Sequence, residues 1–230
     1  MKKFAYHIIT AAILGLLPSC GESFLDQSPQ GQLEEDDLIT PDGVEGLLLG
    51  AYSLLNGNVE GTWGHYASGP SQWLFGDVAA DNAHKGSEPG DQPNMTAIEQ
   101  HQPNSTNDNL AVLWTRCFEG IQRCNQTLAT LAALQGGEDP MNEDRAVEIQ
   151  AEARFLRAHY YFLLRRVYRN VPYVDETTED KNVPNDEDIF PRIEADFRFA
   201  AESLPPEKPR GEVGRVDQIA AKAYLGKVLL

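Results

Sequence analysis

The 230-residue sequence is poor in sulfur and in positive charge. It has three cysteines, and its 19 Lys and Arg stand against 35 Asp and Glu, so its formal net charge is −16. A phosphate backbone needs a basic surface, so we expect no nucleic acid as a partner. Cys117 and Cys124 lie on one expected helix with Cα atoms about 10 Å apart, too far for a disulfide. We expect both to be small buried side chains.

The sequence also lacks the short motifs that mark common catalytic and cofactor sites. It contains no G-x-S-x-G, H-E-x-x-H, C-x-x-C, G-x-G-x-x-G or P-loop pattern, and its histidines have no metal-ligand spacing. Acidic pairs such as Glu34 and Glu35 could suggest glycoside hydrolysis, which needs two opposed carboxylates. They lie in polar runs that are typical of solvated charge. We therefore predict no enzyme, no metal ion and no cofactor.

The one long apolar run is at the N-terminus. Two lysines precede a mostly apolar stretch that ends at Leu17, and an L-P-S-C sequence follows that ends at Cys20. This is the pattern of a signal peptide followed by a lipobox. We predict that residues 1–19 are a lipoprotein signal peptide and that residues 20–39 are a lipidated cysteine and a polar tether. The alternative is an ordinary secretory signal with a chance cysteine.

Helical periodicity is abundant in the rest of the chain. Apolar residues spaced three and four apart predict helices that start near Thr40, Asn107, Asn142, Ile189 and Asp217. The helix after Asn142 is apolar around so much of its circumference that it must pack on at least two neighbours. We therefore predict an all-α domain over residues 40–230.

The last expected helix has a row formed by Ala221, Leu225 and Val228. No C-terminal capping signal follows it before Leu230. We expect this row to need a helix partner from outside the sequence, so that the domain is incomplete at its C-terminus.

Residues 57–106 break the periodicity with many glycines and prolines. A loop this long on a helical scaffold is where binding residues collect. Aromatic rings stack on sugar faces, and short polar side chains hydrogen-bond sugar hydroxyls. The candidate ligand-binding residues are Trp63, Tyr66, Asp81, Asn82 and His84.

The alternative for each aromatic residue of this loop is that it pins the loop to the core. Trp63 has small neighbours and is the better ligand candidate. Trp73 is followed by Leu74 and Phe75, so we expect Trp73 to be an anchor.

The sequence AEARFLRAHYYFLLRRVYRNVPYVDE, residues 151–176, resembles the signature helix of the SusD/RagB family of outer-membrane lipoproteins. Glu152–Ala158 match E-A-R-F-L-R-A in that pattern, and Arg169 stands where the family usually has Gly. Phe24–Pro29 resemble the family's F-L-D-x-x-P opening. Trp114 and Asn125 match a further helix pattern, in which we expect Asn125 to be a buried helix contact.

The resemblance implies tetratricopeptide-like helical pairs that carry long irregular loops. It also implies a surface-exposed lipoprotein, anchored in the outer membrane through Cys20, that binds a glycan or a peptide. The implied partner is a SusC-like TonB-dependent transporter. Two alternatives stay open, a lipid-anchored glycoside hydrolase and a helical-repeat adaptor with no small ligand.

Overall fold

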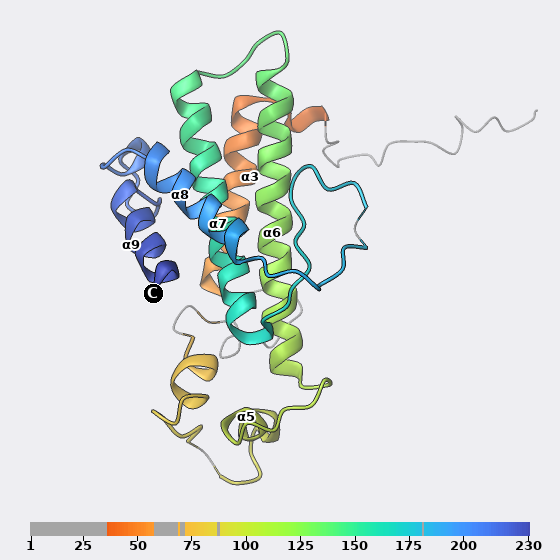
Figure 1. Cartoon of the computed structure of the whole chain (residues 1–230). Coiled ribbons are helices and arrows are strands. Elements are labelled where there is room, and N and C mark those ends of the chain that lie inside the picture. The colour runs from red at the N-terminus through yellow and green to blue at the C-terminus, as the bar shows by residue number, and fades with distance from the viewer. Residues whose placement is uncertain (1–35, 58–68, 70–71, 87, 181) are drawn as a thin grey trace, which may run out of the picture. The chain divides into compact units, whose positions relative to one another are not determined.

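The computed structural model describes residues 36–57, 69, 72–86, 88–180 and 182–230 (Figure 1). Every regular element in these residues is a helix, which confirms the all-α class. The elements are η1 (Asp36–Leu38), α3 (Pro41–Ser53), η2 (Leu54–Asn56), η3 (Leu74–Val78), α5 (Pro93–Glu99), α6 (Asp108–Gln135), α7 (Glu143–Tyr168), α8 (Phe190–Ser203), η4 (Pro209–Gly211) and α9 (Gln218–Leu229). None of the described helices is both long enough and apolar enough to cross a membrane.

Side-chain caps start four of the predicted helices. The side-chain oxygens of Thr40, Asn107, Asn142 and Asp217 each accept a hydrogen bond from a backbone N–H two or three residues later. These bonds satisfy N–H groups that the first turn leaves unpaired. The helix starts predicted at these residues are therefore confirmed.

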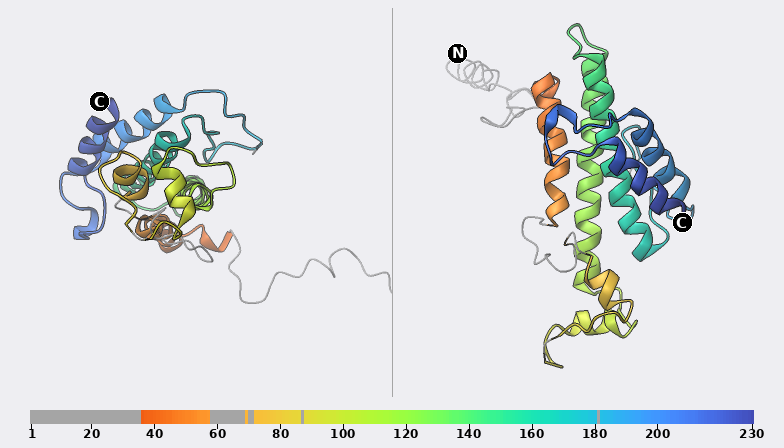
Figure 2. Two further views of the ribbon diagram at one scale, coloured as in Figure 1. Left: turned by 90° about the horizontal axis from the view of Figure 1, so that it is seen from below. Right: turned by 90° about the vertical axis from the view of Figure 1, so that its left-hand side faces the viewer.

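The helices α3, α6 and α7 lie side by side, and α7 also packs against α8 (Figure 1). Helix α9 follows and packs on α8, as both views in Figure 2 show. The resulting core buries α7 on several sides at Ile149, Leu156, Tyr160, Tyr161 and Leu164, each with no exposed side-chain area. Consecutive helices thus pack in pairs, as the resemblance implied.

A buried ionic network ties α3 and α7 to the connection between α8 and α9. Glu152 has no exposed surface and accepts hydrogen bonds from Tyr52 Oη at 2.8 Å, Arg145 at 3.0 Å and Arg215 at 3.2 Å. The same two arginines bond Glu45. Burial alone would raise the pKa of Glu45. The hydrogen bond from Arg145 and the charge of Arg145 nevertheless hold this pKa below its usual value. This network gives Glu152 of the signature helix a structural role.

The expectation that the apolar row of α9 lacks a partner is wrong. Ala221 has no exposed area and Val228 has 5%, while Leu225 packs half-buried against the same core. Helix α8 supplies the partner, and Tyr224 adds ring contacts to Phe155 at 5.1 Å. The periodicity of a sequence predicts an apolar row but does not identify the helix that packs against it.

The prediction of an unbroken irregular stretch over residues 57–106 is also wrong. The described part of it contains η3, a π-helix, and α5. The two elements share a small core of Leu74, Val78, Met95 and Ile98. Each is shorter than two turns of helix, which is too short for a clear 3.6-residue period.

Candidate ligand-binding site

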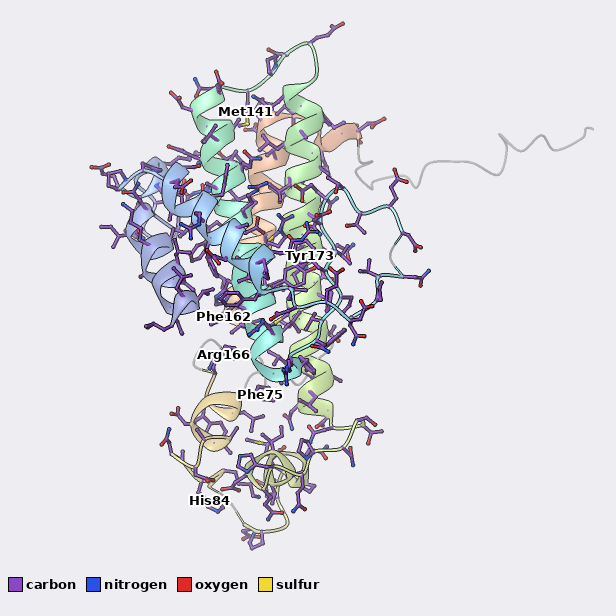
Figure 3. All side chains as sticks on the ribbon, in the orientation of Figure 1. Phe75, His84, Met141, Phe162, Arg166 and Tyr173 are labelled. Atoms are coloured by element: carbon purple, nitrogen blue, oxygen red, sulfur yellow. The ribbon has the colours of Figure 1, made fainter. Side chains whose placement is uncertain are left out.

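The structure places three of the five predicted site residues. Asp81, Asn82 and His84 lie in the segment between η3 and α5, and Figure 3 labels His84 there. Trp63 and Tyr66 lie outside the described residues. Trp73 packs half-buried against the core that η3 shares with α5, so the expected anchor role of Trp73 is confirmed.

Backbone hydrogen bonds of the π-helix set up this segment. Val78 N bonds Trp73 O at 3.0 Å and Asn82 N bonds Asp77 O at 2.9 Å, both across five residues. Such single π-turns occur frequently at functional sites. Asp81 then adopts a φ of +58°, a left-handed conformation that aspartate tolerates better than most residues.

Asp81 and Asn82 are two of the exposed polar residues of the segment whose side chains have no partner among the described residues; Glu88, Asp91 and Gln92 are others. Within the described residues, the side chains of Asp81 and Asn82 form neither a hydrogen bond nor an ion pair. Their carboxylate and amide groups are therefore free to bond a ligand without first breaking a contact in the protein.

His84, by contrast, is engaged. Its Nδ1 contacts Glu99 Oε1 of α5, and this bond holds the pKa of the Glu99 carboxyl below its usual value. The neighbouring Lys85 is buried, and its ammonium donates to the backbone carbonyls of Glu88, at 2.9 Å, and Asp91. These contacts link the segment to α5 and to its own backbone, and ligand binding by His84 stays a prediction.

Helix α5, to which the segment is bonded through Glu99, is tied in turn to the start of α6. Asn107 Nδ2 donates to Asn94 O at 2.8 Å, and Asn94 Nδ2 donates to Asp108 Oδ1 at 2.8 Å. His101 Nε2 lies 2.8 Å from Ala79 O. The candidate residues are thus mounted on a long helix through specific bonds rather than on a free loop.

A second site, which sequence reasoning missed, is a groove of about 940 Å³ beside α6. One side is formed by α6, and the other by the connection between α7 and α8 together with η1 (Figure 1). We call it the α6 groove, and its lining includes Asp36, Ile39, Trp114, Thr115, Phe118, Glu119, Gln122, Asn125, Gln126, Thr130, Pro172, Val174, Asp175 and Glu176. The volume is within the range of small-molecule sites.

The wall of the α6 groove opposite α6 is held in place by Tyr161 and Asn125. Val174 O accepts from Tyr161 Oη at 2.8 Å and from Asn125 Nδ2 at 3.0 Å, and Val174 N donates to Tyr161 Oη at 2.7 Å. Tyr173, labelled in Figure 3, stacks on Tyr161 with ring centroids 4.8 Å apart. Asn125 is half-buried and bonds the connection between α7 and α8 as well as Arg157 of α7, so the prediction of a buried helix contact is only partly right.

Arg157 of the signature helix completes this wall. It is 3% exposed and makes two bonds to Asp196 of α8, at 2.7 and 3.0 Å. It also bonds Asn125 Oδ1 at 3.0 Å and the carboxylate of Glu176. One buried guanidinium thus joins α6, α7, α8 and the loop, which explains the second arginine of the E-A-R-F-L-R-A pattern.

A signal for the α6 groove was present in the sequence. Thr115, Gln122, Gln126 and Thr130 recur at steps of seven, four and four residues, which places them on one face of the helix. Helical periodicity identifies the apolar face, and polar residues on the opposite face are usually no more than a solvated surface.

Comparison with known proteins shows the family. A profile of SusD-like proteins, described as starch-binding and associating with the outer membrane, matches residues 23–230. The chain belongs to the SusD-like family. It is 26% identical over 236 residues to a SusD-like protein from Bacteroides ovatus, an alignment that covers 100% of this chain and 39% of that protein.

Solved structures agree with this assignment. Surface glycan-binding protein A from Bacteroides fluxus is similar at 27% identity and a TM-score of 0.68, over 83% of this chain and 40% of that one. A laminarin-binding SusD-like protein is similar at 25% identity and a TM-score of 0.66, over 82% of this chain and 40% of that one. The chain therefore spans about two fifths of the length of the proteins it resembles.

Proposed function

We propose that this protein binds glycan at the cell surface and delivers it to a SusC-like TonB-dependent transporter in the outer membrane. Family membership supports the outer-membrane setting, and two similar solved structures are of glycan-binding proteins. The main support for glycan binding is that Asp81 and Asn82 are exposed and have no partner among the described residues. Their segment is bonded to α5, which is bonded to the start of α6.

The proposed binding residues are Trp63, Tyr66, Asp81, Asn82 and His84. Stacking on aromatic rings and hydrogen bonds to planar polar groups are how proteins recognise sugars. In this arrangement Trp63 and Tyr66 supply the apolar surface, Asp81 and Asn82 bond hydroxyl groups, and His84 fixes their position. Residues 1–19 act as the signal peptide, Cys20 holds the lipid, and residues 40–230 form the helical domain.

No observation favours a glycoside hydrolase. Such an enzyme needs one carboxyl group that can give up a proton and a second that is free to act as base or nucleophile. Two pairs of carboxylates that share arginines, Glu45 with Glu152 and Glu176 with Asp196, are held in ion pairs. Their geometry is that of ion pairs that hold the helices together.

Calorimetry against uncharged oligosaccharides, including laminarihexaose and maltohexaose, tests the binding. We expect Trp63→Ala to weaken affinity about tenfold and Asp81→Ala or Asn82→Ala about fivefold, at nearly unchanged thermal stability. Trp73→Ala is the contrasting variant, because it should lower stability and leave the loop's ligand contacts in place. Wild-type protein that binds none of the glycans would refute the proposal, as would full affinity in Trp63→Ala and Asp81→Ala.

Delivery is tested separately by co-purification. The lipoprotein, extracted from membranes in mild detergent, should carry the SusC-like transporter encoded in the same genome. Recovery of the lipoprotein without any transporter, under conditions in which the transporter is intact, would remove the delivery step and leave glycan binding.

A further inference from the structure

The side of α6 that lines the α6 groove carries a row of polar side chains that have no partner in the part of the chain that the structure describes. Within the described residues, Thr115, Gln122, Gln126 and Thr130 make no side-chain hydrogen bond. The row spans about 22 Å at a helical rise of ~1.5 Å per residue. Each amide offers two donor hydrogens and an acceptor oxygen, so the groove presents hydrogen-bonding groups along an extended line.

One end of this row has an aromatic surface. The rings of Trp114 and Phe118 lie with centroids 4.7 Å apart, and the edge contact of Trp114 with Tyr168 at 5.1 Å holds the indole. Both Trp114 and Phe118 line the groove and are only half-buried. An apolar ring face beside a row of amides and hydroxyls is suited to a sugar, which has an apolar ring face and a polar rim.

The charges of the groove select against an anionic ligand. Its lining contains four carboxylates, from Asp36, Glu119, Asp175 and Glu176, and no lysine or arginine among the described residues. Glu119 is paired with Arg123 and Glu176 with Arg157, while Asp175 accepts from two threonine hydroxyls. A sulfated or uronic-acid glycan would meet like charge here, whereas an uncharged glycan meets the free amides.

The shape of the groove does not depend on a ligand. The bonds of Tyr161 and Asn125 to Val174, and of Arg157 to Glu176, hold the second wall in place. A preformed site loses little conformational entropy on binding, which favours recognition of a flexible oligosaccharide by modest individual contacts.

We propose that the α6 groove is a second oligosaccharide-binding site, which takes an extended, uncharged stretch of glycan. Gln122 and Gln126 bond its hydroxyls, and Trp114 with Phe118 contacts one sugar face. This inference rests on the proposed function, since it assigns the same ligand class, but it uses none of the residues between η3 and α5.

The test uses the full chain, purified in detergent, with Trp63→Phe and Trp73→Phe. The sequence has three tryptophans, so Trp114 then reports alone, and the change at Trp63 weakens the loop site at the same time. Titration with laminarihexaose or maltohexaose should produce a saturable change in Trp114 fluorescence. Adding Gln122→Ala and Gln126→Ala should weaken this apparent affinity about tenfold.

Two controls accompany the titration. Gln150→Ala removes an amide from α7, outside the groove, and should leave the affinity unchanged. Dextran sulfate should give no saturable change, because the described lining of the groove holds four carboxylates and no lysine or arginine to bind its sulfates.

The results separate this inference from the proposed function. If calorimetry shows that wild-type protein binds these glycans while Trp114 fluorescence stays constant at saturation, the groove site is overturned and the proposed function stands. An equal loss of affinity in Gln150→Ala, or equal binding of dextran sulfate, would also overturn it. If Trp114 responds while Asp81→Ala and Asn82→Ala have no effect, the groove site stands and the loop assignment fails.

Discussion

Gly120 of α6 lies directly against the ring of Tyr160 of α7. A Cβ atom at Gly120 would be 2.5 Å from Tyr160 Cε2 and 2.6 Å from Cδ2. Tyr160 is fully buried and its hydroxyl donates to Ala51 O of α3 at 2.8 Å. The absent side chain at Gly120 is what lets α6 and α7 approach closely enough for this ring to reach α3.

Gly120→Ala should therefore destabilise the protein although alanine is the better helix former. The added methyl group must displace Tyr160 or separate the helices, and such overpacking costs about 1–3 kcal/mol. Gly46→Ala on α3 is the matched control, because nothing lies within 4 Å of its Cβ position, and it should gain up to about 1 kcal/mol. Urea unfolding measures the free energy of unfolding of both variants. Equal stabilisation by the two changes would contradict the close contact of Gly120 with Tyr160.

Arg169→Gly should stabilise the protein. Arg169 has φ +63° and ψ −66°, and Asn170 N bonds Tyr168 O at 2.7 Å across it. These values describe a γ-turn with positive φ, which is rare and strained for a residue with a side chain. Relief of about 1–3 kcal/mol of strain exceeds the entropic cost of glycine, about 0.5–1 kcal/mol.

The control for this change is Arg166→Gly, one turn earlier inside α7, which should lose about 1 kcal/mol. Thermal melts of the two variants should move in opposite directions. A lower melting temperature for Arg169→Gly than for the wild type would show that the arginine side chain stabilises the turn.

Acidification between pH 6.5 and 5 should weaken the fold through His159. Burial among Tyr160 and Tyr224, with Arg116 and Lys227 nearby, lowers the pKa of His159 to about 3. The unfolded chain takes up this proton near pH 6.5, and the folded chain does not. Below pH 6.5 the unfolded state therefore binds more protons, and stability falls with pH until about pH 3.

We expect a loss of about 1–2 kcal/mol of unfolding free energy between pH 6.5 and pH 5. His159→Phe keeps a ring in place and should remove most of this dependence, as measured by urea unfolding at the two pH values. Carboxyl groups with a shifted pKa, such as Glu45 and Asp188 with a lowered pKa and Glu152 and Asp196 with a raised one, are present in both proteins, so the comparison with the variant isolates His159. An unchanged pH slope in the variant would assign the effect to another group.

Arg157→Ala should lower the free energy of unfolding strongly, because Arg157 is a buried cation. The change leaves buried Asp196 with only the longer contact to Arg154 at 3.7 Å, and breaking a buried ion pair costs about 3–5 kcal/mol. Arg198→Ala removes an ion pair with Glu194 that lies on the exposed side of α8, and it should cost far less because solvent screens exposed pairs. Similar losses of unfolding free energy in the two variants would show that the contacts of Arg157 do not stabilise the packing of the helices.

Cys20→Ala should abolish lipid attachment. The L-P-S-C sequence that ends at Cys20 predicts acylation of this thiol, and two or more acyl chains are needed for firm membrane anchoring. Metabolic labelling with a fatty-acid analogue measures the attachment, and Ser19→Ala serves as a neighbouring control that should still be labelled. Label retained in Cys20→Ala would refute the lipoprotein assignment.

Much of the fold could be predicted from sequence because its determinants are local. A helix start depends on the capping residue and the next few residues. The sequence therefore predicts the starts at Thr40, Asn107, Asn142 and Asp217. The short elements η3 and α5 were missed because one or two turns carry too little periodicity.

The candidate site could be predicted only in part from the sequence. Asp81 and Asn82 were selected by residue type and surroundings, and the structure adds that both are exposed and uncommitted. Binding by them, and by Trp63, Tyr66 and His84, stays a prediction. The polar row of the α6 groove was present in the sequence, but the groove itself could not be predicted, because a polar helix face becomes a groove only when another segment forms the opposite wall.

The sequence by itself thus determined which segments become helices, where most of them begin and to which family the chain belongs, since caps, periodicity and signature motifs are short-range properties. The tertiary structure alone decided what those helices bury and expose. Arg157 meets Asn125 and Asp196, 32 and 39 residues away, and Arg215 meets Glu45 across 170 residues. Such partners are set by how the helices dock, which depends on the packing of all their faces together and on close contacts such as that of Gly120 with Tyr160.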